Sequence, residues 1–510
     1  MNASKVKNYP ELVFGLVGPI GADMDCIVEE LSLALRQVGY EPIPIHITSV
    51  LPSMVGKMDA GGSLFSKIEL ANSVRSDTGD NAILATVAML EIKRERGERN
   101  RQDNVTPLND KISITEIPRP KAAYIIRQLK RDEEISRLRY VYGDSFIQVS
   151  VAVDEAKQMH NVTTYVSRME PRLNGSDRES KARELIATDK MELSNEAGQR
   201  MLDAYQSADF FVAGNTRDEI SRGLVRFVKA IFGSNHVSPH KEEFGAMMAK
   251  TASLRSVDLS RQVGAAIVNS SGDIISLGCN EVPSAGGGQY WGDDARPARD
   301  IEVGVDSNKI ETSGIIDGFV NLLKDCNVLV EGYEEKMKNS DFSSGLKKLA
   351  ISDLTEFGRI THAEMSAITE AARLGRSLSG ATMIVTTFPC HNCAKHIVAS
   401  GISRVVYIEP YAKSRALQMH QDSISSDSNV QGKVKIEHFM GISPRRFREI
   451  FEKKARKDKS THKAETWCFG EPEPLLFEGT SFHTKREMNE IEKAYIKLKG
   501  CGFSIDASGD

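Results

Sequence analysis

The sequence predicts an α/β protein with two main domains, and three observations support this prediction. The chain has 510 residues, more than a single hydrophobic core usually organises. Hydrophobic residues make up 40% of it and charged residues 27%, as in folded globular proteins. In the first half, short apolar runs alternate with amphipathic stretches, which favours a parallel sheet covered by helices on both faces.

The elements of the first half follow from the spacing of apolar residues. The run "LVFGLVG" (12–18) predicts a buried strand, and 23–39 has apolar residues at helical spacing and ends on Gly39. Further strands are expected at 40–48, 122–129, 145–153 and 208–214. Helices are expected at 131–141, 179–190 and 195–206. The polar segment 93–111 is expected to be a loop or a lid.

A second domain is expected after the polar segment 232–243, which contains Gly and Pro. Residues 261–269 and 273–280 predict a hairpin across Ser-Ser-Gly, and an insert rich in Gly, Asp and Lys follows at 285–350. The elements expected next are helix 361–374, strand 382–388, helix 391–401, and strands 404–410 and 433–439. The expected domains are 1–235, 240–455 and a C-terminal extension at 456–510.

Composition excludes several classes of protein. A net charge of −4 gives no general attraction to nucleic acids or membrane surfaces. No apolar run reaches the ~18 residues of a membrane span, and we see no signal peptide, so a cytoplasmic protein is expected. Seven scattered cysteines make a poor disulfide framework. Only Cys390 and Cys393 are close together, which indicates a metal-binding or redox-active pair.

Four residues in otherwise ordinary helical sequence predict a metal site. His362 and Glu364 begin one helix, and Cys390 and Cys393 stand at the start of the next, after Pro389. One imidazole and two thiolates suit tetrahedral zinc with a fourth position open for water. Zinc lowers the pKa of such a water molecule from ~15.7 to ~7.

Glu364 has a separate predicted role. It stands two residues after His362 and need not be a ligand, so it is placed to carry a proton from water to substrate. The pattern His-x-Glu followed by Pro-Cys-x-x-Cys is the signature of zinc nucleobase deaminases. The alternatives are a redox pair or a structural zinc site, for which His391 or His396 would be the fourth ligand. Neither alternative explains Glu364.

The wider sequence resembles a known family. The segment "RSVDLSRQVGAAIVNSSGDIISLGCNEVPSAGGGQYWGDDARPARD", the HAE and PCHNC motifs and "IEPYAKSRALQMHQDSI" resemble deoxycytidylate deaminases. The fusion to an N-terminal P-loop-like α/β domain resembles the bacterial anti-phage dCTP deaminases. The resemblance covers roughly 10–455. It implies a P-loop NTPase/kinase-like domain followed by a cytidine deaminase-like α/β/α domain.

The resemblance also implies an activity. The expected reaction is zinc-dependent deamination of dCTP to dUTP, or of dCMP to dUMP, which would deplete deoxycytidine nucleotides during phage infection. His362, Cys390 and Cys393 would bind zinc and Glu364 would move the proton. The expected partners are free deoxycytidine nucleotides, copies of the chain in a homo-oligomer and, by resemblance alone, a regulatory small RNA. No membrane partner is expected.

Residues expected to bind substrate surround these motifs. In the deaminase fold the second strand ends in an Asn that binds the sugar or base, and Asn280 matches that place; the alternative is a turn-forming Asn. Arg261, Arg296 and Arg299 are candidates for the phosphates, and surface positions are their alternative. Tyr411 and Lys413 follow a strand at the expected active-site edge.

The N-terminal loop "GLVGPIGADMD" (15–25) follows a strand and opens a helix, as a phosphate-binding loop does. Gly18 and Gly21 are the candidate cofactor-binding residues. Where a Walker A motif has its Lys, this sequence has Met24, so binding of a nucleotide is favoured over hydrolysis. The domain is therefore expected to be a regulator, a sensor or an assembly module. The basic segment 444–459 is expected to be a solvated helix, with RNA or phosphate contact as the alternative.

Two other functions compete with nucleotide deamination. A deaminase acting on single-stranded nucleic acid would need a basic groove and stacking aromatics, which a net charge of −4 and 6% aromatic residues do not favour. A binding module with a structural zinc site is the third possibility, and Glu364 argues against it.

Overall fold

The computed structural model describes most of the chain. The described residues are 9–54, 64–107, 112–190, 198–339, 342, 345–346, 349, 351, 354, 356–411, 413–427, 429–453, 456–470, 472–475 and 483–503. The chain forms two compact units, Met1–Glu243 with Met440–Asp510, and Phe244–Phe439. Each unit is built on a six-stranded sheet, so the expected mixed α/β fold is confirmed.

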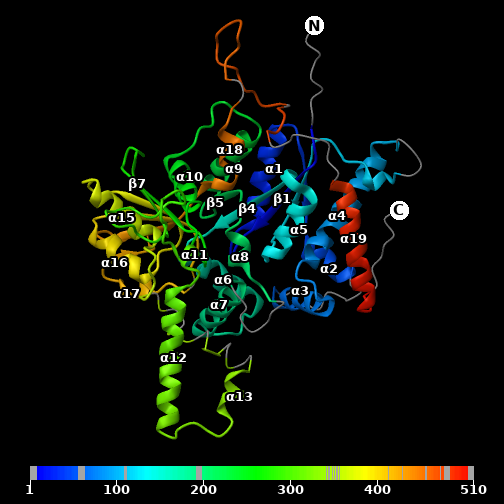
Figure 1. The fold of residues 1–510 in the computed structure, drawn as a ribbon. Helices are drawn as coiled ribbons and strands as arrows, with labels where there is room; N and C mark the ends of the chain where they lie inside the picture. The colour runs from blue at the N-terminus through cyan, green and yellow to red at the C-terminus, as the bar shows by residue number, and fades with distance from the viewer. Residues whose placement is uncertain are drawn as a thin grey trace. The chain divides into compact units, whose positions relative to one another are not determined.

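The first unit has the strand order β12-β5-β4-β1-β3-β2 (Figure 1). Its strands are β1 (Leu12–Val17), β2 (Glu41–Ile45), β3 (Ala122–Ile126), β4 (Phe146–Ala152), β5 (Phe210–Ala213) and β12 (Gly441–Ile442). The first five run parallel, as predicted, and β12 is antiparallel to β5. β1 pairs with β3 and β4, so the loop at its carboxyl end lies between two neighbouring strand ends.

Helices cover both faces of this sheet. They are α1 (Met24–Gln37), α2 (Ile47–Met54), α3 (Leu64–Thr78), α4 (Ile83–Gln102), α5 (Asp132–Tyr142), α6 (Glu155–Met169), α7 (Gly175–Lys190), α8 (Met201–Tyr205), α9 (Arg217–Ile231), α18 (Pro444–Phe451) and α19 (His483–Gly500), with short 3₁₀ turns η1 (Ile114–Glu116) and η2 (Gly143–Ser145). From β1 the chain crosses the sheet in one direction to β2, and from β3 it crosses in the opposite direction to β4. Because such crossovers are right-handed, α1 and α5 lie on opposite faces. α9 packs beside α1, and α4, α8 and α19 contact α5.

α4 extends through 93–102, so the prediction of a loop or lid is wrong for these residues. Residues 103–107 are not helical, and 108–111 lie outside the described residues. The charges stabilise the helix. Arg94 donates to Glu98 one turn later, at 2.7 Å. Arg96 is fully buried and donates to Glu487 of α19, also at 2.7 Å. A run of charged residues therefore pairs along the helix and into the core.

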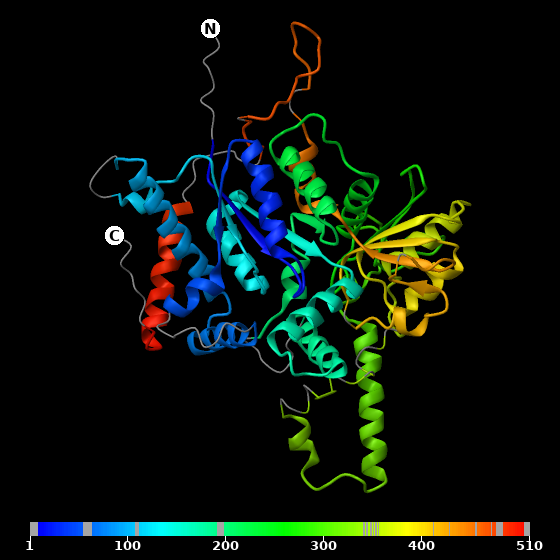
Figure 2. The ribbon, with the colours of Figure 1, turned by 180° about the vertical axis from the view of Figure 1, so that it is seen from behind.

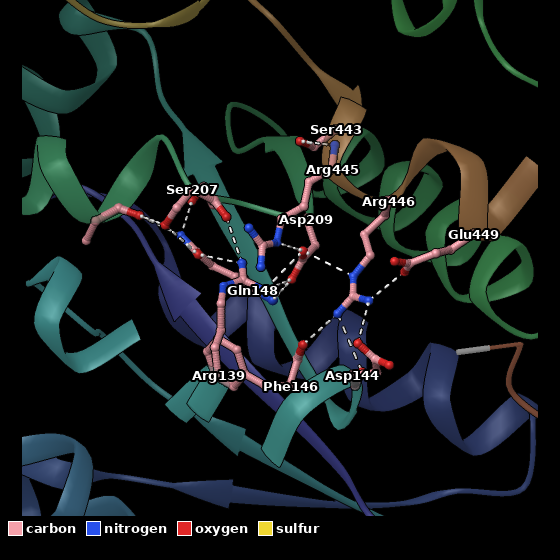
Figure 3. Close-up of polar contacts among 12 residues, drawn as sticks. Arg139, Asp144, Phe146, Gln148, Ser207, Asp209, Ser443, Arg445, Arg446 and Glu449 are labelled. Atoms are coloured by element: carbon pink, nitrogen blue, oxygen red, sulfur yellow. Dashed lines mark hydrogen bonds and ion pairs between the residues drawn. The ribbon is translucent and has the colours of Figure 1, made fainter. Parts of the chain in front are cut away.

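A buried cluster within the first unit ties residues 440–451 to its sheet (Figure 3). Asp209, just before β5, accepts hydrogen bonds from Arg446 of α18 at 3.2 Å and from Arg139 of α5 at 3.1 Å. Its backbone carbonyl accepts from the amide of Ser443 at 3.0 Å. Residues 440–451 therefore fold with the first unit, although the sequence analysis placed them in the second domain, and Arg446 is buried in a segment expected to be solvated.

The second unit has the strand order β10-β11-β9-β8-β6-β7. Its strands are β6 (Gly264–Val268), β7 (Ile274–Cys279), β8 (Thr382–Thr387), β9 (Arg404–Glu409), β10 (Ile424–Ser425) and β11 (Val434–His438). β6 and β7 form the predicted antiparallel hairpin, and β8, β9 and β11 are parallel.

The helices that the structure describes in this half of the chain include α10 (Lys241–Ser253), α11 (Asp300–Val303), α12 (Ser307–Asp325), α13 (Tyr333–Met337), α15 (Ala363–Arg373), α16 (His391–Ala399) and α17 (Ala416–Met419). α15 packs across β6 and β7. α12 and α13 belong to the insert expected at 285–350 and extend away from the sheet of their own unit (Figure 1). Among the described residues, no helix is both long and apolar enough to cross a bilayer.

Candidate active site and metal centre

Two helix N-termini carry the residues of the predicted metal site. His362 is the N-cap of α15, and Cys390 is the N-cap of α16. α15 follows a backbone bridge between Glu281 and Thr361, and α16 follows β8. Because α15 packs on β7 and also contacts α16, the starts of the two helices lie together beside the β6–β7 hairpin.

Small residues set the distance between α15 and the sheet. A Cβ atom on Gly278 of β7 would overlap the backbone of Ala363 and Ala367. The hydroxyl of Ser276, two residues before this glycine, donates to the carbonyl of Ala367 at 2.8 Å. Gly278 therefore lets the first turn of α15 lie directly on β7, and this contact fixes the position of His362.

His362, Cys390 and Cys393 form a cluster that fits Zn²⁺, so the predicted cofactor is supported by this geometry. Their ligand atoms all lie within 4.8 Å of one another. The Nδ1 atom of His362 is 3.4 Å from the Sγ atom of Cys390 and 3.4 Å from that of Cys393. Tetrahedral zinc, with bonds of about 2.0–2.3 Å, places nitrogen and sulfur ligands roughly 3.5 Å apart.

Hydrogen bonds within the cluster shift the pKa values of its members. The Cys393 thiol, with a further contribution from His362, lowers the pKa of Cys390 to about 3. The same contact raises the pKa of Cys393 well above its ordinary value. The hydrogen bond with Cys390 raises the pKa of His362 to about 9. A divalent cation would replace the shared protons, because thiolate and neutral imidazole are the forms that bind metal.

Glu364 lies in the first turn of α15 and is only 4% exposed. Burial raises the pKa of its carboxyl group, and the neighbouring Cys390 adds to the increase. A buried carboxyl group next to metal ligands is placed to accept and return a proton.

The site opens into a cavity of about 330 Å³ within the second unit. Its lining includes six of the residues predicted from the sequence: Arg261, Asn280, His362, Glu364, Cys390 and Tyr411. A cavity of this size is typical of a site for one small molecule.

Asn280 lines the cavity, but its amide already makes three hydrogen bonds with the protein. Its Oδ1 atom accepts from the amide of Val263 at 2.7 Å. Its Nδ2 atom donates to the Asp258 carboxylate and to the carbonyl of Arg261, both at 2.8 Å. In this structure the side chain therefore orders the loop before β6, and a direct contact with substrate remains a prediction.

The candidate phosphate-binding residues occupy different places. Arg261 lines the cavity, with its guanidinium 5.2 Å from the ring centre of Tyr411, which also lines it. Arg299 does not line this cavity; it precedes α11 and donates to the Glu302 carboxylate at 2.9 Å. Arg296 is exposed.

The sequence analysis missed several polar residues of the lining. They include Asp258, Asp306, Asn308 and Lys309. The last three stand at the start of α12, in the insert, where Asp306 is the N-cap and accepts from the amide of Lys309 at 3.1 Å. An N-cap is visible in the sequence, but nothing in the spacing places this helix start next to the zinc motif.

The predicted phosphate loop has the expected local form in the first unit. Gly18 directly follows β1, and Gly21 has a φ of +89°, a left-handed conformation that favours glycine. Asp23 caps α1 by accepting from the amide of Cys26 at 3.0 Å. Nucleotide binding by this loop stays a prediction.

Several known proteins are similar to part of this chain. Residues 309–409 match the model of the cytidine and deoxycytidylate deaminase zinc-binding region. The deoxycytidylate deaminase of Enterobacteria phage T2 is 56% identical over 54 residues, 11% of this chain and 29% of that protein. The human enzyme of the same name is 25% identical over 166 residues, 32% of this chain and 63% of that protein. The chain thus spans less than a third of the phage relative and less than two thirds of the human one.

A solved structure is also similar, namely the dCMP deaminase of cyanophage S-TIM5 in complex with dCMP and dUMP. It is 20% identical, covers 40% of this chain and 100% of its own, and has a TM-score of 0.23. Residues 309–409 contain His362, Cys390 and Cys393, the cluster that fits zinc. Within these residues, the chain therefore has a zinc-binding region similar to that of the cytidine and deoxycytidylate deaminases.

Proposed function

We propose that the second unit is a zinc-dependent deaminase that hydrolyses deoxycytidine nucleotides, dCTP foremost, to deoxyuridine nucleotides and ammonia. The observation that carries the proposal is the position of Glu364. It is a buried carboxyl group with a raised pKa, in the same cavity as His362 and Cys390. A structural zinc site or a redox pair has no use for such a group.

The reaction consumes one water molecule and replaces the 4-amino group of cytosine by oxygen. Zinc, when bound, lowers the pKa of that water molecule and so makes it a nucleophile at neutral pH. Glu364 would take one proton from the water and deliver it to N3 of the ring, then take the second proton from the new hydroxyl group on C4 and deliver it to the departing amino group. His362, Cys390 and Cys393 would hold the metal, and ammonia is the leaving group.

The cavity supports a free nucleotide as the substrate. A volume of about 330 Å³ is at the lower end of the usual range for small-molecule sites and is small for a nucleic-acid strand. Arg261 and Lys309 are the cationic side chains of its lining, and an arginine can bind a phosphate group through two hydrogen bonds. Asp258 and Asp306 lie on the same cavity and offer acceptors for sugar hydroxyl groups.

The resemblance to anti-phage dCTP deaminases leads us to propose the biological role as well. Depletion of deoxycytidine nucleotides would deprive an infecting phage of a DNA precursor. Cells that express the wild-type chain should therefore resist infection, whereas cells with Glu364→Gln at equal protein level should not. Equal protection by both chains would show that protection against phage does not require deamination.

One assay tests the reaction and the class of substrate. Ammonia release and product mass are measured with dCTP, dCMP, cytidine and a single-stranded DNA that contains cytosine. We expect dCTP and dCMP to react and the nucleoside to react poorly. Equal rates for cytidine and dCTP would contradict phosphate recognition. Faster reaction of the DNA would establish the alternative of a nucleic-acid deaminase, and no ammonia from any substrate would refute deamination.

A further inference from the structure

The loop at 18–23 in the first unit is already bound to an acidic side chain. The backbone amide of Ile20 donates to Oδ2 of Asp189, at the end of α7, at 2.7 Å. Lys130 donates to Oδ1 of the same carboxylate at 2.6 Å and to the carbonyl of Gly18 at 2.8 Å. Asp189 is 2% exposed and Lys130 is 9% exposed, so this arrangement is shielded from water.

Side chains of α6 hold the same loop by donating hydrogen bonds to the loop's backbone carbonyl groups. Gln158 donates to the carbonyl of Ile20 at 3.0 Å, and Asn161 donates to the carbonyl of Gly21 at 2.9 Å. A Cβ atom on Gly21 would lie 2.9 Å from the side chain of Val162. α6 therefore rests directly on the turn where the sequence predicted a phosphate to bind.

The α6–α7 hairpin has a small hydrophobic core of its own. The two helices lie side by side (Figure 1; Figure 2 shows them from behind). The buried members of this core are Val162, Val166, Ala182, Leu185 and Ile186, and Ile20 of the loop packs against them. None of these five belongs to the core cluster between the sheet and α1. Of the hydrophobic packing in this core, separation of the hairpin from the loop would lose only that of Ile20. It would also break the hydrogen bonds of Asp189, Gln158 and Asn161 with the loop.

The physical setting favours a negative charge at this place. The loop follows a central parallel strand and leads into α1, so its amides and the helix dipole attract an anion. Asp189 supplies that anion and Lys130 the matching cation. Burying a carboxylate and an ammonium group costs nearly as much as their attraction returns, so an anion that pairs better with Lys130 can compete with Asp189.

We propose that Asp189 is an internal occupant of an anion site on the 18–23 loop. In this proposal the α6–α7 hairpin is a lid, and a ligand with phosphate groups opens it by taking the place of the Asp189 carboxylate on Ile20 and Lys130. The inference concerns the first unit and does not depend on the deaminase activity proposed for the second. A phosphate has more oxygen acceptors than a carboxylate and can contact both donors at once.

Calorimetric titration of the full chain with pyrophosphate tests the proposal, with ADP in parallel to show whether the ligand is inorganic or a nucleotide. Asp189→Asn keeps the size of the side chain and removes its charge. We expect it to bind one of the two ligands about tenfold or more tightly than the wild type, since hydrogen bonds to charged groups are worth a factor of this size. Glu184→Gln, the same change at an exposed position of α7, should match the wild type.

Two further measurements test whether the ligand binds at Lys130 and whether it opens the α6–α7 hairpin. The double change Asp189→Asn with Lys130→Met should lose the gained affinity, because the cation of the site is gone. In the wild type, saturating ligand should speed hydrogen exchange of the α6 and α7 amides, and this readout does not depend on how any variant folds. Equal affinity of Asp189→Asn and Glu184→Gln, no binding of either ligand, or unchanged exchange in α7 would each overturn the proposal.

Discussion

Arg446 and Asp209 form a buried ion pair, although 237 positions separate them in the sequence. The Nε atom of Arg446 lies 3.2 Å from Oδ1 of Asp209, and the same guanidinium donates to the carbonyl of Phe146 at 3.0 Å and to Glu449 at 2.6 Å. Asp209 is completely buried. The chain therefore leaves the first unit after residue 243 and returns to it at 440, and this pair binds the returning segment to the sheet (Figure 3).

The first prediction concerns this anchor. Arg446→Ala should lower the free energy of unfolding of the first unit by about 2–3 kcal/mol, because Asp209 loses a charged hydrogen bond but keeps Arg139. Urea unfolding of the purified chain measures the change. Arg448→Ala is the matched control on the same helix, because Arg448 is exposed and pairs with Glu452, and it should leave the transition unchanged. A smaller effect for Arg446→Ala than for its control would refute the anchoring role.

This anchor also shows where sequence reasoning stops. The basic character of 444–459 is visible in the sequence, and the structure has a helix over part of it, at 444–451. The burial of Arg446 depends on Asp209, and no local pattern connects two residues so far apart. The same limit explains the wrong prediction for 93–102, where Arg96 is buried because Glu11 and Glu487 surround it.

The metal site could be predicted from the sequence better than the Arg446–Asp209 pair, because the residues of its motifs stand close together in the chain. His362 and Glu364 are two residues apart, Cys390 and Cys393 are three apart, and each pair stands at a helix start. The rest of the cavity is assembled over long distances in the sequence. Asp306 and Lys309 enter it from the insert, and only the fold brings that helix start to the lining.

The second prediction separates the metal ligands from the proton carrier. His362→Ala and Cys393→Ala should lose bound zinc and deaminase activity together, because each removes one of three protein ligands. Glu364→Gln should retain zinc and lose about 10²–10⁴-fold in turnover, since it removes only proton transfer. Metal analysis by mass spectrometry and the ammonia assay, performed on the same preparations, check both outcomes. A fully active Glu364→Gln enzyme would refute the proposed mechanism.

The third prediction tests how β7 positions the metal site. Gly278→Ala places a methyl group against the backbone of Ala363 and Ala367, so α15 must move away from the sheet. We expect a loss of about 1–3 kcal/mol in stability, as for overpacking in a core, and a lower zinc content because His362 moves with the helix. Thermal unfolding and metal analysis report the two effects.

Gly314→Ala in α12 is the control for this substitution, because within the described part of the chain no atom beyond its neighbours and its own helix backbone lies within 4 Å of the added methyl group. It should keep the zinc content of the wild type and be slightly more stable, since alanine is the better helix former. If Gly278→Ala behaved like Gly314→Ala, the close approach of α15 to β7 would not determine the geometry of the site.

The fourth prediction concerns the pH dependence of stability and rests on Glu11. Burial alone would raise the pKa of this carboxyl group, but Arg96 and His483 outweigh it and lower the pKa from 4.5 to about 2. The unfolded chain therefore binds a proton at this group at higher pH than the folded chain does. The stabilisation is fully present above about pH 4.5 and is lost as the pH falls toward 2, and it amounts to roughly 3 kcal/mol.

The unfolding temperature of the wild type should consequently fall as the pH is lowered from about 5 to about 3. Glu11→Gln cannot titrate at this position, so its unfolding temperature should start lower at neutral pH and decline less steeply over the same interval. Glu184→Gln changes an exposed carboxyl group. It should keep the slope of the wild type, because Glu11 and the other buried carboxyl groups still titrate in this variant. Calorimetric scans of the three proteins in matched buffers provide the comparison. Parallel slopes for the wild type and Glu11→Gln would mean that Glu11 does not carry its charge in the folded protein, and that Arg96 is balanced by Glu487 alone.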